Sequence, residues 1–198
     1  LRKEGAAGPW EARMATAAAE KKRFTYQDYL KTPDDKQYEL IEGDLVLTPS
    51  PAPYHQWISK NLGYEVERFV REKGPGKVFY APCDVYLDHE NVLQPDILFI
   101  SKERRSIIGE KNIQGAPDLV IEILSEATAY RDLVKKKKLY ERFGVKEYWI
   151  VDPQEKTIEI YAPEGKAFVR IKTFSENDTL ESSFLAGLRI ELSSVFAF

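Results

Sequence analysis

The stretch Asp118–Leu124, with the sequence DLVIEIL, decides the fold. After Asp118 it is a continuous apolar run, broken only by Glu122. A run of this length, rich in β-branched residues, is typical of a strand that is buried on both faces of a sheet. An ionised carboxylate inside such a strand is costly unless a cation or good hydrogen bonds meet it. The stretch therefore predicts a central strand that carries a carboxylate with a partner.

A second stretch, Gln94–Ile100 (QPDILFI), repeats this pattern around Asp96. Two acidic side chains in neighbouring apolar strands could point at one spot. Two carboxylates plus water suit Mg²⁺, which prefers oxygen ligands and keeps part of its hydration shell. Asp118 lies four residues before Glu122, about 13 Å away along a strand, which is too far to share one ion. The alternative for each carboxylate is a position at a sheet edge or a pair with an arginine.

The remaining patterns predict an α/β (α+β) fold in which helices flank a mixed central sheet. Residues 101–115 are polar without a strong period, and we expect them to be irregular. Apolar spacing of three and four residues predicts helices, and apolar runs between turn residues predict strands. The expected helices are 24–30, 55–72 and 130–143, and the expected strands are a hairpin over 38–47, then 78–87, 92–100, 118–124, 147–151, 157–161 and 167–174.

Length and composition limit the classes of protein to which this chain can belong. The chain has 198 residues and a net charge of −3, which fits one globular domain and argues against a general nucleic-acid coating protein. We expect residues 1–23 to be a tag remnant and disordered lead-in, and residues 24–198 to form the domain. The single Cys83 cannot form a disulfide within the chain, which indicates a cytoplasmic setting. No apolar run is long enough for a membrane span.

Several chemistries are excluded by the motifs. The sequence lacks a Gly-rich phosphate loop followed by lysine, and it lacks the Gly-x-Ser-x-Gly pattern of hydrolases. One cysteine and two histidines cannot build a structural zinc site. The paired carboxylates therefore remain the strongest chemical signal in the chain.

A run of lysines, residues 135–138, follows the central strand in the expected helix. At about 100° per residue, Tyr130, Leu133, Tyr140 and Phe143 predict an inward apolar stripe. The first and last lysines of the run point away from this stripe. Lys136 and Lys137 flank it on either side, so helical periodicity cannot choose between them.

These residues together resemble a large prokaryotic family of restriction-endonuclease-like proteins, a divergent branch of the PD-(D/E)XK nucleases. The resemblance covers about Phe24 to Tyr161, and its combination of motifs is specific. The motifs that carry it are Tyr38–Gly43 (YELIEG), the Ser50 and His55 neighbourhood, Gln94-Pro95-Asp96, Asp118–Ser125 (DLVIEILS), Asp132-x₃-Lys136-x₃-Tyr140 and Gly144–Asp152 (GVKEYWIVD).

The resemblance implies a site for Mg²⁺, with Mn²⁺ as a substitute, in which Asp96 and Glu122 are the ligands. It implies a catalytic lysine that has moved from the usual place, occupied here by Leu124, to the next helix, and it selects Lys136. Glu39 is implied as a further acidic group near the metal. His55 and Tyr140 are possible helpers, although Tyr140 could equally be a core aromatic residue.

The implied function is metal-dependent endonucleolytic hydrolysis of DNA. The alternative is a catalytically silent nuclease fold that binds nucleic acid or protein. Because the net charge is negative, DNA must meet a local basic surface, for which residues 101–115 offer the best candidates. These candidates are Lys102, Arg104, Arg105 and Lys111.

Cutting both strands of a duplex needs two active sites, so we expect a homodimer or a higher homo-oligomer. Apolar residues crowd the C-terminal end of the chain and offer an interface. They could equally close the core of the monomer. These residues are Leu185, Leu188, Ile190, Leu192, Val195, Phe196 and Phe198.

Overall fold

The central strand lies inside a mixed six-stranded sheet. The computed structural model describes residues 22–33, 35–125 and 129–198. The strand order of this main sheet is β11-β10-β9-β8-β6-β3, with β8 parallel to β9 and antiparallel to β6. The strands are Gly76–Tyr80 (β3), Ile97–Ser101 (β6), Leu119–Ile123 (β8), Glu147–Asp152 (β9), Thr157–Glu164 (β10) and Ala167–Ser175 (β11). All five residues of β8 are buried, which confirms the predicted central strand.

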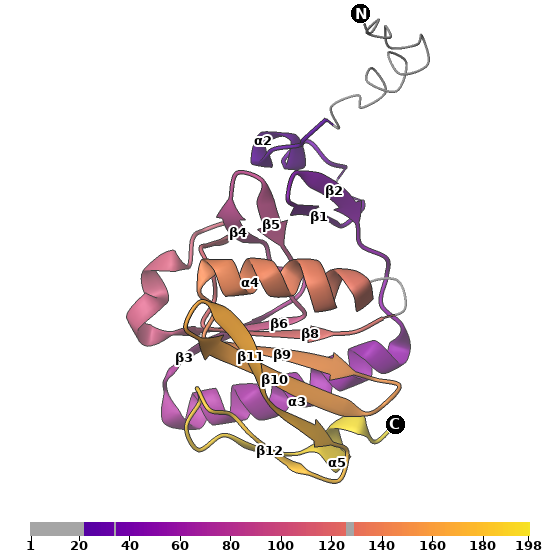
Figure 1. The fold of residues 1–198 in the computed structure, drawn as a ribbon, viewed down its shortest axis with the longest axis vertical. Coiled ribbons are helices and arrows are strands. Elements are labelled where there is room, and N and C mark those ends of the chain that lie inside the picture. The colour runs from indigo at the N-terminus through magenta and orange to yellow at the C-terminus, as the bar shows by residue number, and fades with distance from the viewer. Residues whose placement is uncertain (1–21, 34, 126–128) are drawn as a thin grey trace, which may run out of the picture.

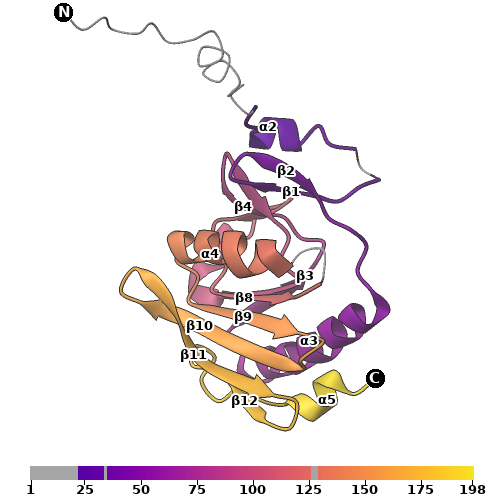
Figure 2. The same ribbon diagram turned by 45° about the vertical axis from the view of Figure 1, so that its right-hand side comes forward.

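Helices cover both faces of the main sheet, as Figures 1 and 2 show. Alternate residues of β6 and β8 pack on opposite sides: Ile97 and Ile121 join the core beneath helix α3 (Pro53–Lys73). Leu98 and Val120 join the core beneath helix α4 (Lys137–Phe143). Because strand side chains alternate, Glu122 lies on the α4 face. This arrangement confirms the predicted α+β class.

A second sheet stands beyond α4, at the N-terminal end of the molecule (Figure 1). Its strand order is β2-β1-β5-β4-β7, and the short helix α2 (Tyr26–Tyr29) packs against it. The expected hairpin over 38–47 forms β1 and β2. The strands are Tyr38–Ile41 (β1), Asp44–Leu47 (β2), Val85–Asp88 (β4), Asn91–Leu93 (β5) and Ile113–Gln114 (β7).

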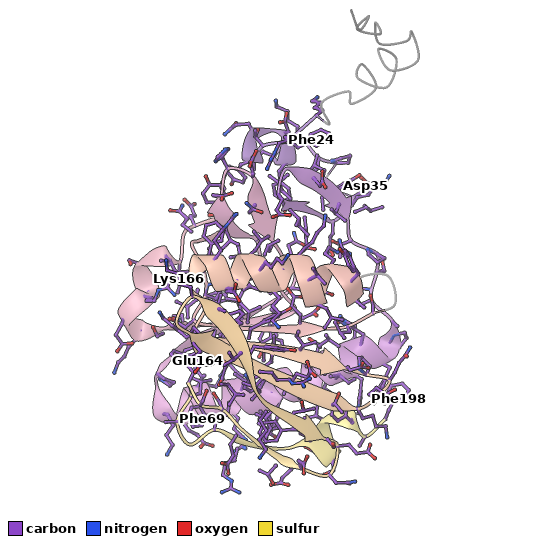
Figure 3. The ribbon with its side chains drawn as sticks, viewed as in Figure 1. Phe24, Asp35, Phe69, Glu164, Lys166 and Phe198 are labelled. Atoms are coloured by element: carbon purple, nitrogen blue, oxygen red, sulfur yellow. The ribbon has the colours of Figure 1, made fainter. Side chains whose placement is uncertain are left out.

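The C-terminal segment closes the core on the α3 side. It comprises β12 (Thr179–Glu181), β13 (Arg189–Glu191) and helix α5 (Leu192–Phe196). The apolar residues of 185–196 that the sequence offered as an interface are buried within the monomer, because they join the core beneath α3. Only Phe198 of that set is exposed, at 83%. Figure 3 shows it at the right-hand edge of the lower part of the molecule, far from Phe24.

Two strand predictions were wrong in extent. The expected strand 78–87 is divided into β3 and β4, and the expected strand 92–100 is divided into β5 and β6. Pro82 and Pro95 lie at the two breaks, where a missing N–H cannot contribute to a ladder of hydrogen bonds. Each expected strand therefore contributes to both sheets. The segment expected to be irregular contains a 3₁₀ helix, η1 (Lys102–Ile107), and β7.

The helix expected over 130–143 is present but begins differently. Its first part, η2 (Arg131–Lys136), is a π-helix that continues into α4. The i→i+5 bonds of a π-helix change the angle between successive side chains. Tyr130 and Leu133 are therefore exposed, at 71% and 39%, and the predicted inward stripe was wrong for both. The buried side chains are instead Asp132, Lys136, Leu139 and Tyr140.

The expected lead-in over 1–23 lies almost entirely outside the described residues. Lys22 and Arg23 are the exceptions. The Arg23 guanidinium donates to Glu42 O and to Glu90 Oε2, at 3.3 and 2.7 Å. No helix in the described ranges is long and apolar enough to span a membrane.

Candidate active site

Glu122 lies near the end of β8 with its side chain 3% exposed. Its Oε1 atom accepts two hydrogen bonds, from the Tyr140 hydroxyl at 2.7 Å and from Lys136 Nζ at 3.1 Å. Its Oε2 atom accepts no hydrogen bond from the described residues. The Oε1 atom is thus held by Lys136 and Tyr140, and the Oε2 atom remains as a candidate ligand atom.

Asp96 lies immediately before β6, beside Glu122. The register of β6 and β8 pairs Ile97 with Ile121, so one further step places Asp96 opposite Glu122. Directly opposite residues of antiparallel strands have Cβ atoms about 5 Å apart. The Asp96 Oδ2 atom accepts a hydrogen bond from Ile123 N at 2.8 Å, which fixes the carboxylate against the end of β8. The structure therefore brings the two predicted carboxylates together.

Lys136 reaches the same place from η2. Its Nζ atom is 2.9 Å from Glu39 Oε1, 3.1 Å from Glu122 Oε1 and 3.2 Å from Asp132 Oδ1, and the side chain is 5% exposed. Lys137 points elsewhere, with its Nζ atom 3.6 Å from the centre of the Tyr161 ring. The geometry separates the two lysines that periodicity left tied, and it places Lys136 among the carboxylates.

The buried charges shift the pKa values of their neighbours. Burial raises the pKa of Glu122; Lys136 opposes this rise, and the carboxylates of Asp132, Asp96 and Glu39 add to it, so the net shift is well upward. Burial alone would lower the pKa of Lys136, but the same acidic neighbours outweigh it and raise that pKa well above its usual range. Lys136 therefore stays an ammonium ion, held by negative charge.

Glu39 comes from β1 of the second sheet and is 1% exposed. Its Oε1 atom accepts a hydrogen bond from Gln94 N at 2.9 Å, in addition to the contact with Lys136. Its Oε2 atom lies 3.6 Å from Nη1 of Arg131. Glu39 thereby joins the second sheet to this cluster.

His55 enters from α3. Its Nε2 atom lies 3.0 Å from the carbonyl oxygen of Ile123 and 3.4 Å from Asp96 Oδ2. Burial lowers the pKa of His55, but the hydrogen bond and charge of Asp96 and the Ile123 carbonyl outweigh it, and the net shift is upward. Its other ring nitrogen, Nδ1, is buried without a hydrogen-bond partner in the described part of the chain.

Sequence reasoning missed two residues of this cluster, Asp132 and Arg131. Asp132 is 2% exposed and contacts Lys136 from one turn earlier in the helix. A signal was present, because residues four apart on a helix are neighbours and Asp132 precedes Lys136 by four. Arg131 carried no such signal, since its inward direction depends on the π-helical turn.

The proposed basic surface lies away from these carboxylates. Asp96 precedes β6 and η1 follows it, so roughly 17 Å of strand separates them. Arg104 Nη1 lies 3.2 Å from Asp118 Oδ1, and Asp118 also accepts from Ser101 N at 2.8 Å. Asp118 thus anchors η1, a role that the sequence did not predict. Lys102 and Arg105 are exposed, and the structure does not bring them to the site.

The donor set fits a divalent cation. Three carboxylates, those of Glu39, Glu122 and Asp132, contact Lys136, and Glu39 also lies near Arg131. The fourth carboxylate, Asp96, stands beside Glu122 and contacts His55. Negative charge is therefore in excess at a buried place, which a divalent cation would offset. Within residues 22–33, 35–125 and 129–198 no three His, Cys, Asp or Glu side chains are grouped to hold a metal. An ion at Asp96 and Glu122 would take its other ligands from water, as Mg²⁺ commonly does.

Comparison with known proteins shows the fold and the family of this chain. A crystal structure of a putative nuclease from Anabaena variabilis is similar, with a TM-score of 0.73 and 22% sequence identity over 87% of this chain and 97% of that chain. Identity this low shows a shared fold. No curated protein matches. Residues 25–193 match the Uma2 family, described as putative restriction endonuclease. The chain therefore belongs to this family, within the PD-(D/E)XK superfamily that its motifs indicated.

Proposed function

We propose that this protein is a metal-dependent endonuclease that hydrolyses phosphodiester bonds of DNA in the cytoplasm. One observation carries the proposal: the ammonium group of Lys136 is buried within 3.2 Å of Glu39, Glu122 and Asp132, while Asp96 stands opposite Glu122. A structural ion pair needs one carboxylate, whereas the Lys136 ammonium group contacts three of them beside the end of β8.

Asp96 and Glu122 are the residues that would hold Mg²⁺, or Mn²⁺ in its place, through the oxygens that face away from Ile123 N and Lys136. When bound, the ion would polarise the scissile phosphate and acidify a water molecule. The carbonyl oxygen of Ile123, a further oxygen at the same strand end, is engaged by His55. His55 therefore holds the end of β8 in place beside the ligands.

The chain's own residues divide the remaining work. Lys136 would orient the attacking water or stabilise the charge that develops on the phosphate oxygens. Tyr140 donates to the same Glu122 oxygen as Lys136 and so fixes the direction of that carboxylate. Leu124, in the usual position of the lysine, can supply neither charge nor a proton.

The test is cleavage of supercoiled plasmid DNA by matched lysine variants. Wild-type protein should nick or linearise the plasmid with Mg²⁺ or Mn²⁺ and should be inert in EDTA. Lys136→Met should lower the rate by roughly 10²–10³-fold, the typical effect of removing one preorganised electrostatic group. Lys137→Met, one residue away and directed at Tyr161, should stay within a few-fold of wild type.

Circular dichroism should accompany the assay, since Lys136→Met leaves buried carboxylates without their cation. Lys136→Arg, which keeps the charge, gives a second readout if the methionine variant unfolds. Loss of activity in Lys137→Met alone would show that the wrong lysine was chosen. Metal-independent cleavage, or no cleavage by the wild type with either ion, would overturn the proposal.

A further inference from the structure

A groove of about 500 Å³ lies beside the carboxylates, between the β1–β2 hairpin and η2. This volume falls in the range of about 300–1,000 Å³ that is usual for small-ligand sites. Hairpin and helix lie on the same side of the main sheet, as Figures 1 and 2 show. We call it the hairpin groove; its lining residues are Ile41, Val46, Leu47, Pro49, Tyr130, Arg131 and Lys135.

Arg131 joins the hairpin groove to the active site. It lines the groove, and its Nη1 atom lies 3.6 Å from Glu39 Oε2, next to the Lys136 cluster. That Nη1 atom is buried and has no hydrogen-bond partner in the described part of the chain. A guanidinium carries five N–H donors in a planar fork that matches a phosphate group. One guanidinium thus lies where the groove meets the carboxylates, and its Nη1 atom makes a long ion pair but no hydrogen bond to the described residues.

The walls of the groove combine apolar surface with positive charge. The Tyr130 ring is 71% exposed and Leu47 is 52% exposed, so both present a face to solvent. Lys135 adds a second cation beside Arg131, although its Nζ atom lies 3.8 Å from Asp44 Oδ2. An aromatic face for a base and cations for the backbone are the two elements of single-stranded nucleic acid recognition.

We infer that the hairpin groove binds an unpaired nucleotide that flanks the scissile phosphate. The base stacks on Tyr130 against the apolar wall, and Arg131 and Lys135 contact its phosphates. A nucleotide inside a duplex hides its faces in the base stack, so the groove takes either single-stranded DNA or a nucleotide extruded from a duplex. This inference rests on the proposed nuclease function for its orientation, but its binding chemistry can be measured without cleavage.

The experiment is fluorescence anisotropy with a 5′-fluorescein-labelled dT12 oligonucleotide in EDTA, where no metal supports hydrolysis. Tyr130→Ala should weaken binding by about tenfold, within the range reported for removing one base–aromatic stack. Tyr130→Phe keeps the ring and should bind as wild type does. The matched control is Tyr64→Ala, since Tyr64 is a similarly exposed aromatic residue, at 62%, on helix α3 across the main sheet.

A fully paired duplex of the same length is the competitor. It should displace the oligonucleotide less well than unlabelled dT12, and a duplex with one unpaired nucleotide should compete at an intermediate level. Equal affinity in Tyr130→Ala and wild type, no binding of dT12 by the wild type, or stronger competition by the intact duplex would overturn the inference.

The two proposals fail separately. If plasmid cleavage is absent but dT12 binding depends on Tyr130, the groove inference stands and the nuclease proposal falls. If cleavage depends on Lys136 but the affinity for dT12 is the same in Tyr130→Ala and wild type, the nuclease proposal stands and the groove inference falls.

Discussion

Asp118 and Glu122 are buried carboxylates four residues apart, yet their surroundings differ. Asp118 accepts from Ser101 N and pairs with Arg104, both in or next to η1. Glu122 pairs with a lysine that other acids share, and one of its oxygens is left over. The positions of the neighbouring cations therefore distinguish Asp118, a structural carboxylate, from Glu122, a candidate ligand. The strand pattern alone does not give these positions.

This contrast gives a prediction for Asp118→Asn. The substitution keeps the shape of the side chain but weakens its bonds to Ser101 N and Arg104. We expect the free energy of unfolding to fall by about 2 kcal/mol, the order expected when a buried polar partner is lost. Urea denaturation measures this change. Divalent-metal affinity of the folded variant should equal that of wild type, and a loss of affinity would place Asp118 in the metal site after all.

At the residue scale, the apolar strand patterns identified the candidate carboxylates, but the helical pattern did not identify the candidate cations. Glu122 could be identified because a carboxylate inside an apolar strand is costly and therefore conspicuous. Asp96 could be identified because it adjoins an apolar run, although the structure places it just before β6 and not inside the strand. Lys136 could not be separated from Lys137 by phase, because the π-helical turn alters the angle that an α-helix would give. Arg131 could not be found for the same reason.

At the level of elements, the helix formed by η2 and α4 positions the site. It delivers Lys136 and Tyr140 to the same oxygen of Glu122. The helix ends at Gly144, whose φ of +80° lies in the left-handed region. A Cβ atom at this position would meet nothing within 4 Å, so a substitution tests backbone conformation alone.

We therefore expect Gly144→Ala to lower the free energy of unfolding by about 1 kcal/mol, the cost of left-handed backbone for an ordinary residue. Gly144→Asn should lose less, because asparagine tolerates this conformation better. Urea denaturation of both variants makes the comparison. Equal stability of Gly144→Ala and wild type would show that the terminus relaxes and does not hold the helix in place.

Element types were predicted better than their extents. The hairpin, the long helix α3 and the strands β8 to β11 agree with the apolar patterns. The division of two expected strands between two sheets was missed, although Pro82 and Pro95 marked the breaks. The role of a proline depends on which neighbour its missing N–H would have bonded, and that neighbour is distant in sequence.

For the whole molecule, the homodimer stays a prediction. One of the two arguments for it, the apolar C-terminal residues, no longer supports it. All of the C-terminal apolar residues except the exposed Phe198 pack into the monomer core, so they no longer support an interface. What remains is the symmetry of a duplex, which needs an active site for each strand. Light scattering at micromolar concentration should give twice the chain mass of 22.8 kDa. A monomer mass, with or without DNA, would refute the dimer and favour an enzyme that nicks one strand or a module that binds without cutting.

The central claim is that Asp96 and Glu122 form one divalent-metal site, and calorimetric titration with Mn²⁺ tests it most directly. Wild-type protein should bind the ion, while Asp96→Ala and Glu122→Ala should each abolish binding and stay folded. Removing either carboxylate relieves repulsion among the acids. Glu122→Ala, however, leaves Lys136 and Tyr140 without that acceptor, and Asp96→Ala leaves Ile123 N without one, so both variants should lose some stability. Asp118→Asn is the control that keeps its affinity. Mn²⁺ affinity unchanged in both alanine variants would contradict the account.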